Sequence, residues 1–199
     1  QDSSYITGTA DDLEIRHITI DGNGSFSTDA FVNPYGAGNQ YGYINQNRGI
    51  YLNQCHNVKI IECNIYGVED GIFFACTDWG DPALEGRDIT IHGNKIYNVG
   101  KSGIRALTTK RCTITRNNIS LIQGNMAATL ADCKFADGIY ANRLIDFVIS
   151  ENIIDDFIRM GIVLEGNDLT TTGSCNGAAV NNNVVSNGHD ARGTESNRG

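Results

Sequence analysis

A short apolar strand that opens with Gly-Ile recurs five times along this chain. The gaps between successive pairs are 22, 32, 35 and 23 residues, so the repeat has a minimum length and variable insertions. Such a pattern predicts a solenoid. Because no single repeat can bury its own apolar face, neighbouring repeats must stack. The pairs are Gly49-Ile50, Gly71-Ile72, Gly103-Ile104, Gly138-Ile139 and Gly161-Ile162.

Each repeat continues with a second strand, an Asn-containing turn and a short third strand. The third strands begin near Ile65, Ile96, Ile119, Ile154 and Val185. The turn residues are Asn23, Asn94, Asn117, Asn152 and Asn183, with Cys63 in place of Asn on one repeat. Asn tolerates the left-handed backbone of a bend, and stacked Asn side chains can bond to the next repeat. We therefore predict an all-β coil with three strands per rung and about six rungs, in which these asparagines are structural.

Side chains alternate between two faces along each Gly-Ile strand. If the isoleucines point inward, they form one ladder in the core of the coil. The next residue on each rung then points outward, and these residues are Tyr51, Phe73, Arg105, Tyr140 and Val163.

The Gly-Ile strand, the Asn turn and the three-strand rung together resemble the right-handed parallel β-helix of the pectin-lyase-like superfamily. The resemblance covers about residues 13–186 and implies one β-helix domain over residues 1–199. The superfamily contains polysaccharide lyases, glycoside hydrolases, uronan epimerases, phage tailspikes and adhesins. The resemblance therefore implies a fold without choosing among these functions.

One branch of the superfamily, the polygalacturonase-type hydrolases, is matched in part. The segment Val68-Glu69-Asp70-Gly71-Ile72 is similar to their paired-acid strand, and Gly103-Ile104-Arg105 is similar to their arginine strand. Their Gly-His-Gly segment is absent, and residues 98–103 stand where it would be. The Asp-Pro-His-Glu motif of alginate epimerases is also absent.

Composition narrows the set of partners. The net charge of −8 argues against nucleic acid, and no apolar run approaches the ~20 residues of a membrane span. Both ends read as cut, so we expect a fragment of a longer coil or ends covered by partners. The six cysteines show no zinc spacing, and we expect mostly free, buried thiols, with a Cys55–Cys76 bond as the alternative.

The insertions concentrate beside one sheet. Extra residues precede the Gly-Ile strand at 27–48 and 123–137, and follow it at 75–87 and 165–177. Both edges of the Gly-Ile sheet are therefore flanked by long loops. A rigid floor between variable loops predicts a binding groove.

The outward side chains on this floor suggest what binds there. Tyr51, Phe73, Arg105 and Tyr140 lie on consecutive rungs about 4.8 Å apart, so the row extends roughly 15 Å, about three sugar residues. Aromatic faces suit sugar rings, and the Arg fork supplies directional bonds. Glu165 completes the expected substrate-binding set. The alternative is that the aromatic residues pack under the loops.

Two carboxylates occupy the same position of the repeat, just before the Gly. Asp70 and Asp137 are two rungs apart, and roughly 9.5 Å separates such positions. This separation is at the upper end of the ~6.5–9.5 Å expected for an inverting glycosidase. We predict Asp70 and Asp137 as the catalytic pair, with Glu69 raising a neighbour's pKa by like-charge repulsion. The alternative is an Asp-Gly turn in which each Asp bonds its local backbone.

Lyase or epimerase chemistry would use other groups. Arg105 would neutralise a uronate carboxylate, helped by Lys101, Arg143 or Arg159. Calcium would be held by Asp70 with a loop containing Asp78, Asp81 and Glu85, although no compact calcium motif is visible. We expect no other cofactor and no dedicated metal site.

These patterns favour an extracellular, cell-surface or virion protein that binds and cleaves a polysaccharide in the groove. Hydrolysis is preferred slightly over lyase or epimerase action on uronates. A non-catalytic glycan-binding adhesin or tailspike module is the alternative from another class, and a tailspike would be a homotrimer. We expect no nucleic-acid or membrane partner.

Overall fold

The computed structural model describes residues 6–8, 11–23, 25–27, 30–32, 48–75, 86–122, 136–166 and 175–188. These residues contain strands and no helix, so none of them forms a helix that could cross a membrane. The strands are β1 (Ile6–Gly8), β2 (Glu14–Arg16), β3 (Thr19–Asp21), β4 (Ser25–Ser27), β5 (Ala30–Val32), β6 (Arg48–Asn53), β7 (His56–Ile61), β8 (Asn64–Ala75), β9 (Gly86–His92), β10 (Lys95–Thr115), β11 (Asn118–Ile122), β12 (Asp137–Ser150), β13 (Ile153–Phe157), β14 (Met160–Glu165), β15 (Asn176–Asn181) and β16 (Val184–Gly188).

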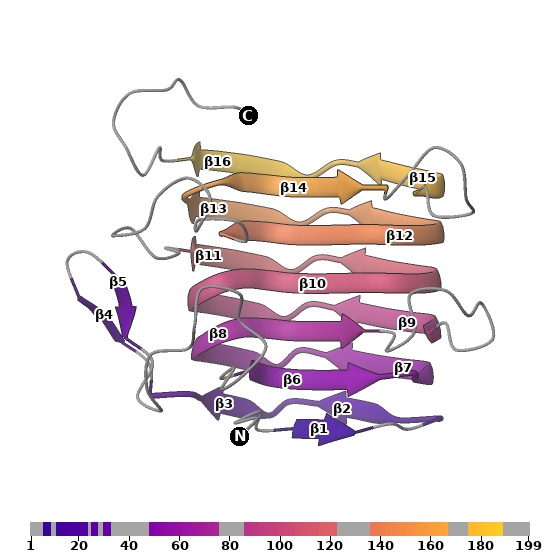
Figure 1. The fold of residues 1–199 in the computed structure, drawn as a ribbon, viewed down its shortest axis with the longest axis horizontal. Coiled ribbons are helices and arrows are strands. Elements are labelled where there is room, and N and C mark those ends of the chain that lie inside the picture. The colour runs from indigo at the N-terminus through magenta and orange to yellow at the C-terminus, as the bar shows by residue number, and fades with distance from the viewer. Residues whose placement is uncertain are drawn as a thin grey trace.

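The strands stack as parallel ladders along one coil (Figure 1). The Gly-Ile ladder runs through β1, β6, β8, β10, β12 and β14. A second ladder begins with β2, β7 and β9, and a third ends with β11, β13 and β16. The long strands β8 and β12 turn one corner and contribute to two ladders each, and β10 turns two corners and contributes to all three. The antiparallel pair β4–β5 lies to one side of the coil.

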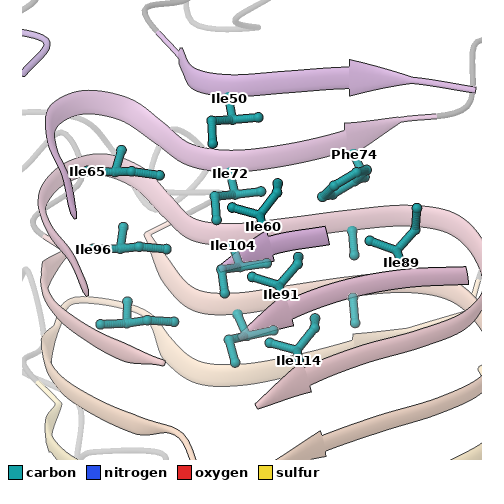
Figure 2. Close-up of a cluster of buried hydrophobic side chains, with 14 of the residues drawn as sticks. Ile50, Ile60, Ile65, Ile72, Phe74, Ile89, Ile91, Ile96, Ile104 and Ile114 are labelled. Carbon is teal, nitrogen blue, oxygen red and sulfur yellow. The ribbon is translucent and has the colours of Figure 1, made fainter. Parts of the chain in front are cut away.

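The predicted isoleucine ladder is confirmed. Ile50 pairs with Ile72, Ile72 with Ile104, Ile104 with Ile139, and Ile139 with Ile162. The first four are fully buried, and Ile162 is partly buried against the same core. Figure 2 shows Ile50, Ile72 and Ile104 directly above one another, with Ile60, Ile91 and Ile114 opposite them.

The Gly before each isoleucine is required by close packing. A Cβ on Gly103 would lie 2.3 Å from Cγ2 of Ile119 and 2.7 Å from the carbonyl oxygen of Gly138. Gly71 and Gly138 meet the same kind of contact, with the next rung and with the third ladder. Any larger residue would push the Gly-Ile strand away from the third strand, so the Gly-Ile pair marks a tight corner of the coil.

The predicted asparagine ladder is present. Nδ2 of Asn94 donates to Oδ1 of Asn117, Asn117 donates to Asn152, and Asn152 donates to Asn183, each at 2.9 Å. Each Oδ1 also accepts the backbone N–H of the asparagine one rung earlier, and the amide of Cys63 donates to Asn94. The ladder therefore satisfies buried polar groups at every step through this corner.

Two details of that prediction are wrong. For the four asparagines of the ladder, the left-handed backbone belongs to the residue before each one, at Gly93, Arg116, Glu151 and Asn182, so the asparagine itself is selected for its side-chain bonds. Asn23 does adopt the left-handed backbone, as predicted. However, Asn23 lies outside the ladder. The amide of Asn64 bonds to the carbonyl of Ile18, which places Ile18 at the ladder position on the first rung.

The described thiols behave as small apolar groups. Cys63 and Cys112 are buried, Cys175 is partly buried, and all three are free, as predicted. Burial raises the pKa of the Cys112 thiol to about 12, which keeps it protonated and unreactive. Cys55 is buried and carries no disulfide, so the alternative Cys55–Cys76 bond is not supported; Cys76 itself lies outside the described residues.

Candidate active site

The outward row of the Gly-Ile sheet forms an apolar cluster of its own. Phe73, Leu107 and Tyr140 are buried together outside the main core, with Tyr51 packed against them. The prediction that all four members of the row are solvent-accessible is therefore wrong for Phe73 and Tyr140, which are 7% and 6% exposed. Tyr51 and Arg105 are partly accessible, as predicted. Two members of the row can meet a ligand directly, and two act mainly in packing.

Arginine side chains alternate with these rings. The guanidinium carbon of Arg48 lies 4.2 Å from the ring centre of Tyr51 and 4.7 Å from that of Phe73. The guanidinium carbon of Arg105 lies 4.9 Å from the ring of Phe73 and 5.4 Å from that of Tyr140. Cation–π contacts at these distances hold each guanidinium against the sheet. The row therefore combines positive charge with aromatic surface.

Asp70, Ser102 and Asp137 form the adjacent row, at the predicted register. Ser102 pairs with Asp70 on one side and with Asp137 on the other. The predicted partial exposure is wrong, since both carboxyl groups are fully buried. Within the described chain, both oxygens of Asp70 and Oδ1 of Asp137 have no hydrogen-bond partner. The alternative of local Asp-Gly turns is therefore not supported for Asp70.

Basic side chains from other rungs explain how these carboxylates are buried. Nε of Arg48 lies 4.0 Å from Oδ2 of Asp70, and Nη1 of Arg159 lies 3.0 Å from Oδ2 of Asp137. Glu69 is paired with Lys101, whose Nζ lies 3.3 Å from its carboxylate. An opposite charge reduces the free-energy cost of burying each acid. These contacts join residues that are 22 to 32 positions apart in the sequence.

Burial changes the protonation of Asp137. Desolvation raises the pKa of this carboxyl group to about 7, and Glu165 raises it further, while the charges of Arg159 and Arg105 act in the opposite direction. Near neutral pH, Asp137 is therefore a carboxylic acid in part of the molecules and a carboxylate in the rest. A carboxyl group with this pKa can donate a proton at the pH where a nearby carboxylate stays ionised.

A second carboxylate, that of Glu165, lies beside Tyr140 and Asn142. The Tyr140 hydroxyl donates a hydrogen bond to Glu165, and Nδ2 of Asn142 lies 3.4 Å from Oε2 of Glu165 and 3.3 Å from the Tyr140 oxygen. Burial and the bond to Glu165 raise the pKa of Tyr140. Glu165 itself is exposed, so its carboxylate is oriented by these two donors and still open to water.

A family model described as "Right handed beta helix region" matches residues 5–198, nearly the whole chain. The chain belongs to the right-handed β-helix family. This assignment confirms the resemblance and agrees with the parallel ladders. Right-handed β-helices are the general architecture of the carbohydrate-active superfamily, and the match names no substrate. No curated protein and no solved structure matches the chain.

Most of the expected calcium site lies outside the described residues, so calcium binding stays a prediction. No group of three or more His, Cys, Asp or Glu side chains suited to a metal occurs among those residues. Asp70, the only described member of the expected set, has the guanidinium of Arg48 beside it, and that charge opposes a divalent cation. Asp78, Asp81 and Glu85 lie outside the described residues.

Sequence reasoning missed the roles of Arg48 and Asn142. Arg48 stands just before Gly49, the position that Asp70 occupies before Gly71, so comparing these positions between rungs could have found it. Asn142 pairs with Leu107 and Glu165 on neighbouring rungs. The signal there was an amide within an apolar strand. The partners of Lys101 and Arg159 could not be read from spacing.

Proposed function

We propose that this β-helix binds a polysaccharide along the outer face of its Gly-Ile sheet and hydrolyses it with carboxyl groups. The observation that carries the proposal is the state of Asp137. Its carboxyl group is buried, has a pKa of about 7, and is influenced by Arg105 and Glu165 from the outward rows. Glycoside hydrolysis requires one carboxyl group that can hold a proton near neutral pH and a second that is ionised.

In this proposal Asp137 is the general acid. Its proton passes to the glycosidic oxygen as the bond to the anomeric carbon breaks. Arg159 donates to Oδ2, so the proposal places the transferable proton on Oδ1. Because Oδ1 is buried, the side chains that cover it would have to move aside for substrate to reach it. The resulting carboxylate is stabilised by the same guanidinium.

The base would be a carboxylate that reaches water. Glu165 meets this requirement because it is exposed and because Tyr140 and Asn142 fix its orientation. Asp70 is the alternative from the predicted pair, and its place two rungs from Asp137 suits the separation of an inverting enzyme. Asp70, like Asp137, is completely buried, so it does not contact bulk water directly as a base must. We therefore propose Glu165 as the general base, with Asp70 as the alternative.

Substrate would lie across Tyr51 and Arg105, the partly accessible members of the outward row. A tyrosine face suits a sugar ring, and a guanidinium donates paired hydrogen bonds to hydroxyl or carboxylate groups. The same Arg105 favours lyase action on uronates as the second candidate, because its charge could neutralise a substrate carboxylate.

One screen distinguishes these reactions. The protein is incubated with neutral and acidic polysaccharides while new reducing ends and the absorbance near 235 nm are measured. Hydrolysis gives reducing ends without that absorbance, and a lyase gives both. Neither signal on any polymer, with retention of a glycan on the protein, would support the adhesin or tailspike module instead.

A further inference from the structure

Two tyrosine rings stack on the outer face of the third ladder. Tyr66 of β8 and Tyr97 of β10 are paired in register, and their ring centres lie 4.9 Å apart with an angle of 18° between the ring planes. Both side chains point outward, because Ile65 and Ile96, which precede them, are buried in the core. Both tyrosines are partly exposed. The pair is therefore an aromatic surface on a different ladder from the candidate active site.

The ring stack stops at the next rung. The position that follows Tyr97 on this ladder belongs to Ser120 of β11, and the one after that belongs to Asp155 of β13. Rungs are about 4.8 Å apart, so roughly 9.6 Å separates the backbone positions of Tyr97 and Asp155. One stacked ring takes up about one rung spacing, as the two tyrosines show. The small Ser120 side chain therefore leaves room for one ring between Tyr97 and Asp155.

The free face of the stack belongs to Tyr97. Tyr66 covers one face of the Tyr97 ring, and in the described part of the chain no second ring covers the other. Tyr66 is itself engaged by Asp21, its partner on the first rung. Desolvation, the charge of Asp21 and a hydrogen bond to Asp21 raise the pKa of the Tyr66 hydroxyl. Tyr66 thus forms the fixed base of the stack, and a ligand ring would add on the side of Ser120.

Two charged side chains border this free face. Nζ of the exposed Lys95 lies 4.9 Å from the centre of the Tyr97 ring. Oδ1 of Asp155 accepts hydrogen bonds from the Ser186 hydroxyl at 2.8 Å and from Nδ2 of Asn187 at 2.7 Å. These two bonds orient the carboxylate and leave Oδ2 to accept from a ligand. Lys95 would repel a cationic ligand and Asp155 an anionic one, so the charges favour a neutral ligand.

We propose that Tyr97, Ser120 and Asp155 form a ring site that binds one sugar residue of a neutral polysaccharide. The C–H face of the sugar would stack on Tyr97, and its hydroxyl groups would donate to Oδ2 of Asp155. Lys95 has a long, exposed side chain that can move off the ring and donate to a sugar oxygen. The site opens outward, so the bound sugar can belong to a longer chain. This inference goes beyond the proposed function, because it needs no cleavage and uses another face of the coil.

The test fills the ring site with a side chain of the protein itself. Maltohexaose, cellohexaose, xylohexaose and mannohexaose are titrated separately, and binding is followed by the amide NMR signals of Ser120 and Asp155. We expect at least one of these neutral oligosaccharides to bind to the unmodified protein. Ser120→Tyr should weaken that binding at least about tenfold, because the new ring would occupy the place of the sugar. Thr113→Tyr is the matched control, since it adds the same ring to the outer face of the second ladder, and its binding should be unchanged.

A second pair of variants tests the stacking face. Tyr97→Ala should weaken binding by about tenfold, whereas Tyr97→Phe, which keeps the ring, should bind like the unmodified protein. Circular dichroism of every variant checks that the coil is intact.

The proposal is overturned if none of the four oligosaccharides shifts the two amide signals, or if Ser120→Tyr and Thr113→Tyr bind equally well. It is also overturned if sedimentation equilibrium shows a dimer of the unmodified protein that Ser120→Tyr abolishes, because the face would then take a second copy of the chain. The release of reducing ends reports on the candidate active site instead. Loss of binding in Ser120→Tyr therefore supports the ring site whatever the polysaccharide screen shows.

Discussion

Nη1 of Arg159 lies 3.0 Å from Oδ2 of Asp137, and this contact joins two residues 22 positions apart on neighbouring rungs. The carboxyl group is nevertheless raised in pKa to about 7, because its desolvation outweighs the charges of Arg159 and Arg105. The ion pair orients the acid without keeping it ionised at neutral pH.

Asp137 should make the stability of the fold depend on pH. Its folded-state pKa of about 7 is above the ordinary 3.8, so the folded protein holds the proton more tightly than the unfolded chain. The contribution of Asp137 to the free energy of unfolding is therefore largest below about pH 4. It is lost as the pH rises through about 7, by up to a few kcal/mol in total. Asp137→Asn should remove this dependence. Denaturant unfolding of both proteins at pH 5 and pH 8 measures this dependence. If the unmodified protein and Asp137→Asn lose the same free energy of unfolding between pH 5 and pH 8, the prediction is contradicted.

Asn117→Ala should destabilise the protein by about 2–4 kcal/mol. The change leaves the N–H and Nδ2 of Asn94 without their shared acceptor and removes the donor to the Ile91 carbonyl. The neighbouring Asn118 is exposed, so Asn118→Ala should change the free energy of unfolding by less than about 0.5 kcal/mol. Chemical denaturation of the two variants gives the comparison. Similar losses in the free energy of unfolding for both variants would contradict a stabilising role of the asparagine ladder.

Gly103→Ala should destabilise the coil by about 1–3 kcal/mol through overpacking, because the new Cβ would lie 2.3 Å from Ile119. Gly86 provides the control, since the nearest atom to a Cβ there is 3.4 Å away. Gly86→Ala should therefore cost much less. Thermal unfolding monitored by circular dichroism distinguishes the two, and equal melting temperatures would show that the corner can relax.

Ile104→Asp should prevent folding. Ile104 is fully buried between Ile72 and Ile139, and an unpaired charge there costs several kcal/mol. The exposed Asn118→Asp should leave the fold intact. Expression as soluble protein and a β-sheet circular dichroism spectrum are the measurements. A folded Ile104→Asp variant would mean that the ladder is not the centre of the core.

The sequence pattern predicts the coil well because every rung must repeat the same packing. A Gly at the tight corner, Ile50 or Ile104 in the ladder and Asn117 at the turn are each selected by neighbours of the same kind, so periodicity alone reveals them. The site is less periodic. The burial of Asp70 depends on Arg48 from another rung, and the protonation of Asp137 depends on desolvation, which spacing does not report.

The left-handed turn residues were assigned wrongly for a related reason. Asn tolerates that backbone, but here Arg116 and Glu151 adopt it, and their side chains project to solvent. The asparagine beside them is needed for its carboxamide instead. A preference of one residue type for a conformation is therefore overridden when a stacked partner requires its side chain.

The central claim is that Asp137 donates the proton for polysaccharide hydrolysis. The most direct measurement is the initial rate of reducing-end release by Asp137→Asn on a polymer that the unmodified protein cleaves, beside Asp70→Asn and Glu165→Gln. We predict that Asp137→Asn lowers kcat by about 10²–10⁴ while the protein stays folded, and that Glu165→Gln has a loss of similar size if it is the base. Turnover by Asp137→Asn at the rate of the unmodified protein would contradict the claim.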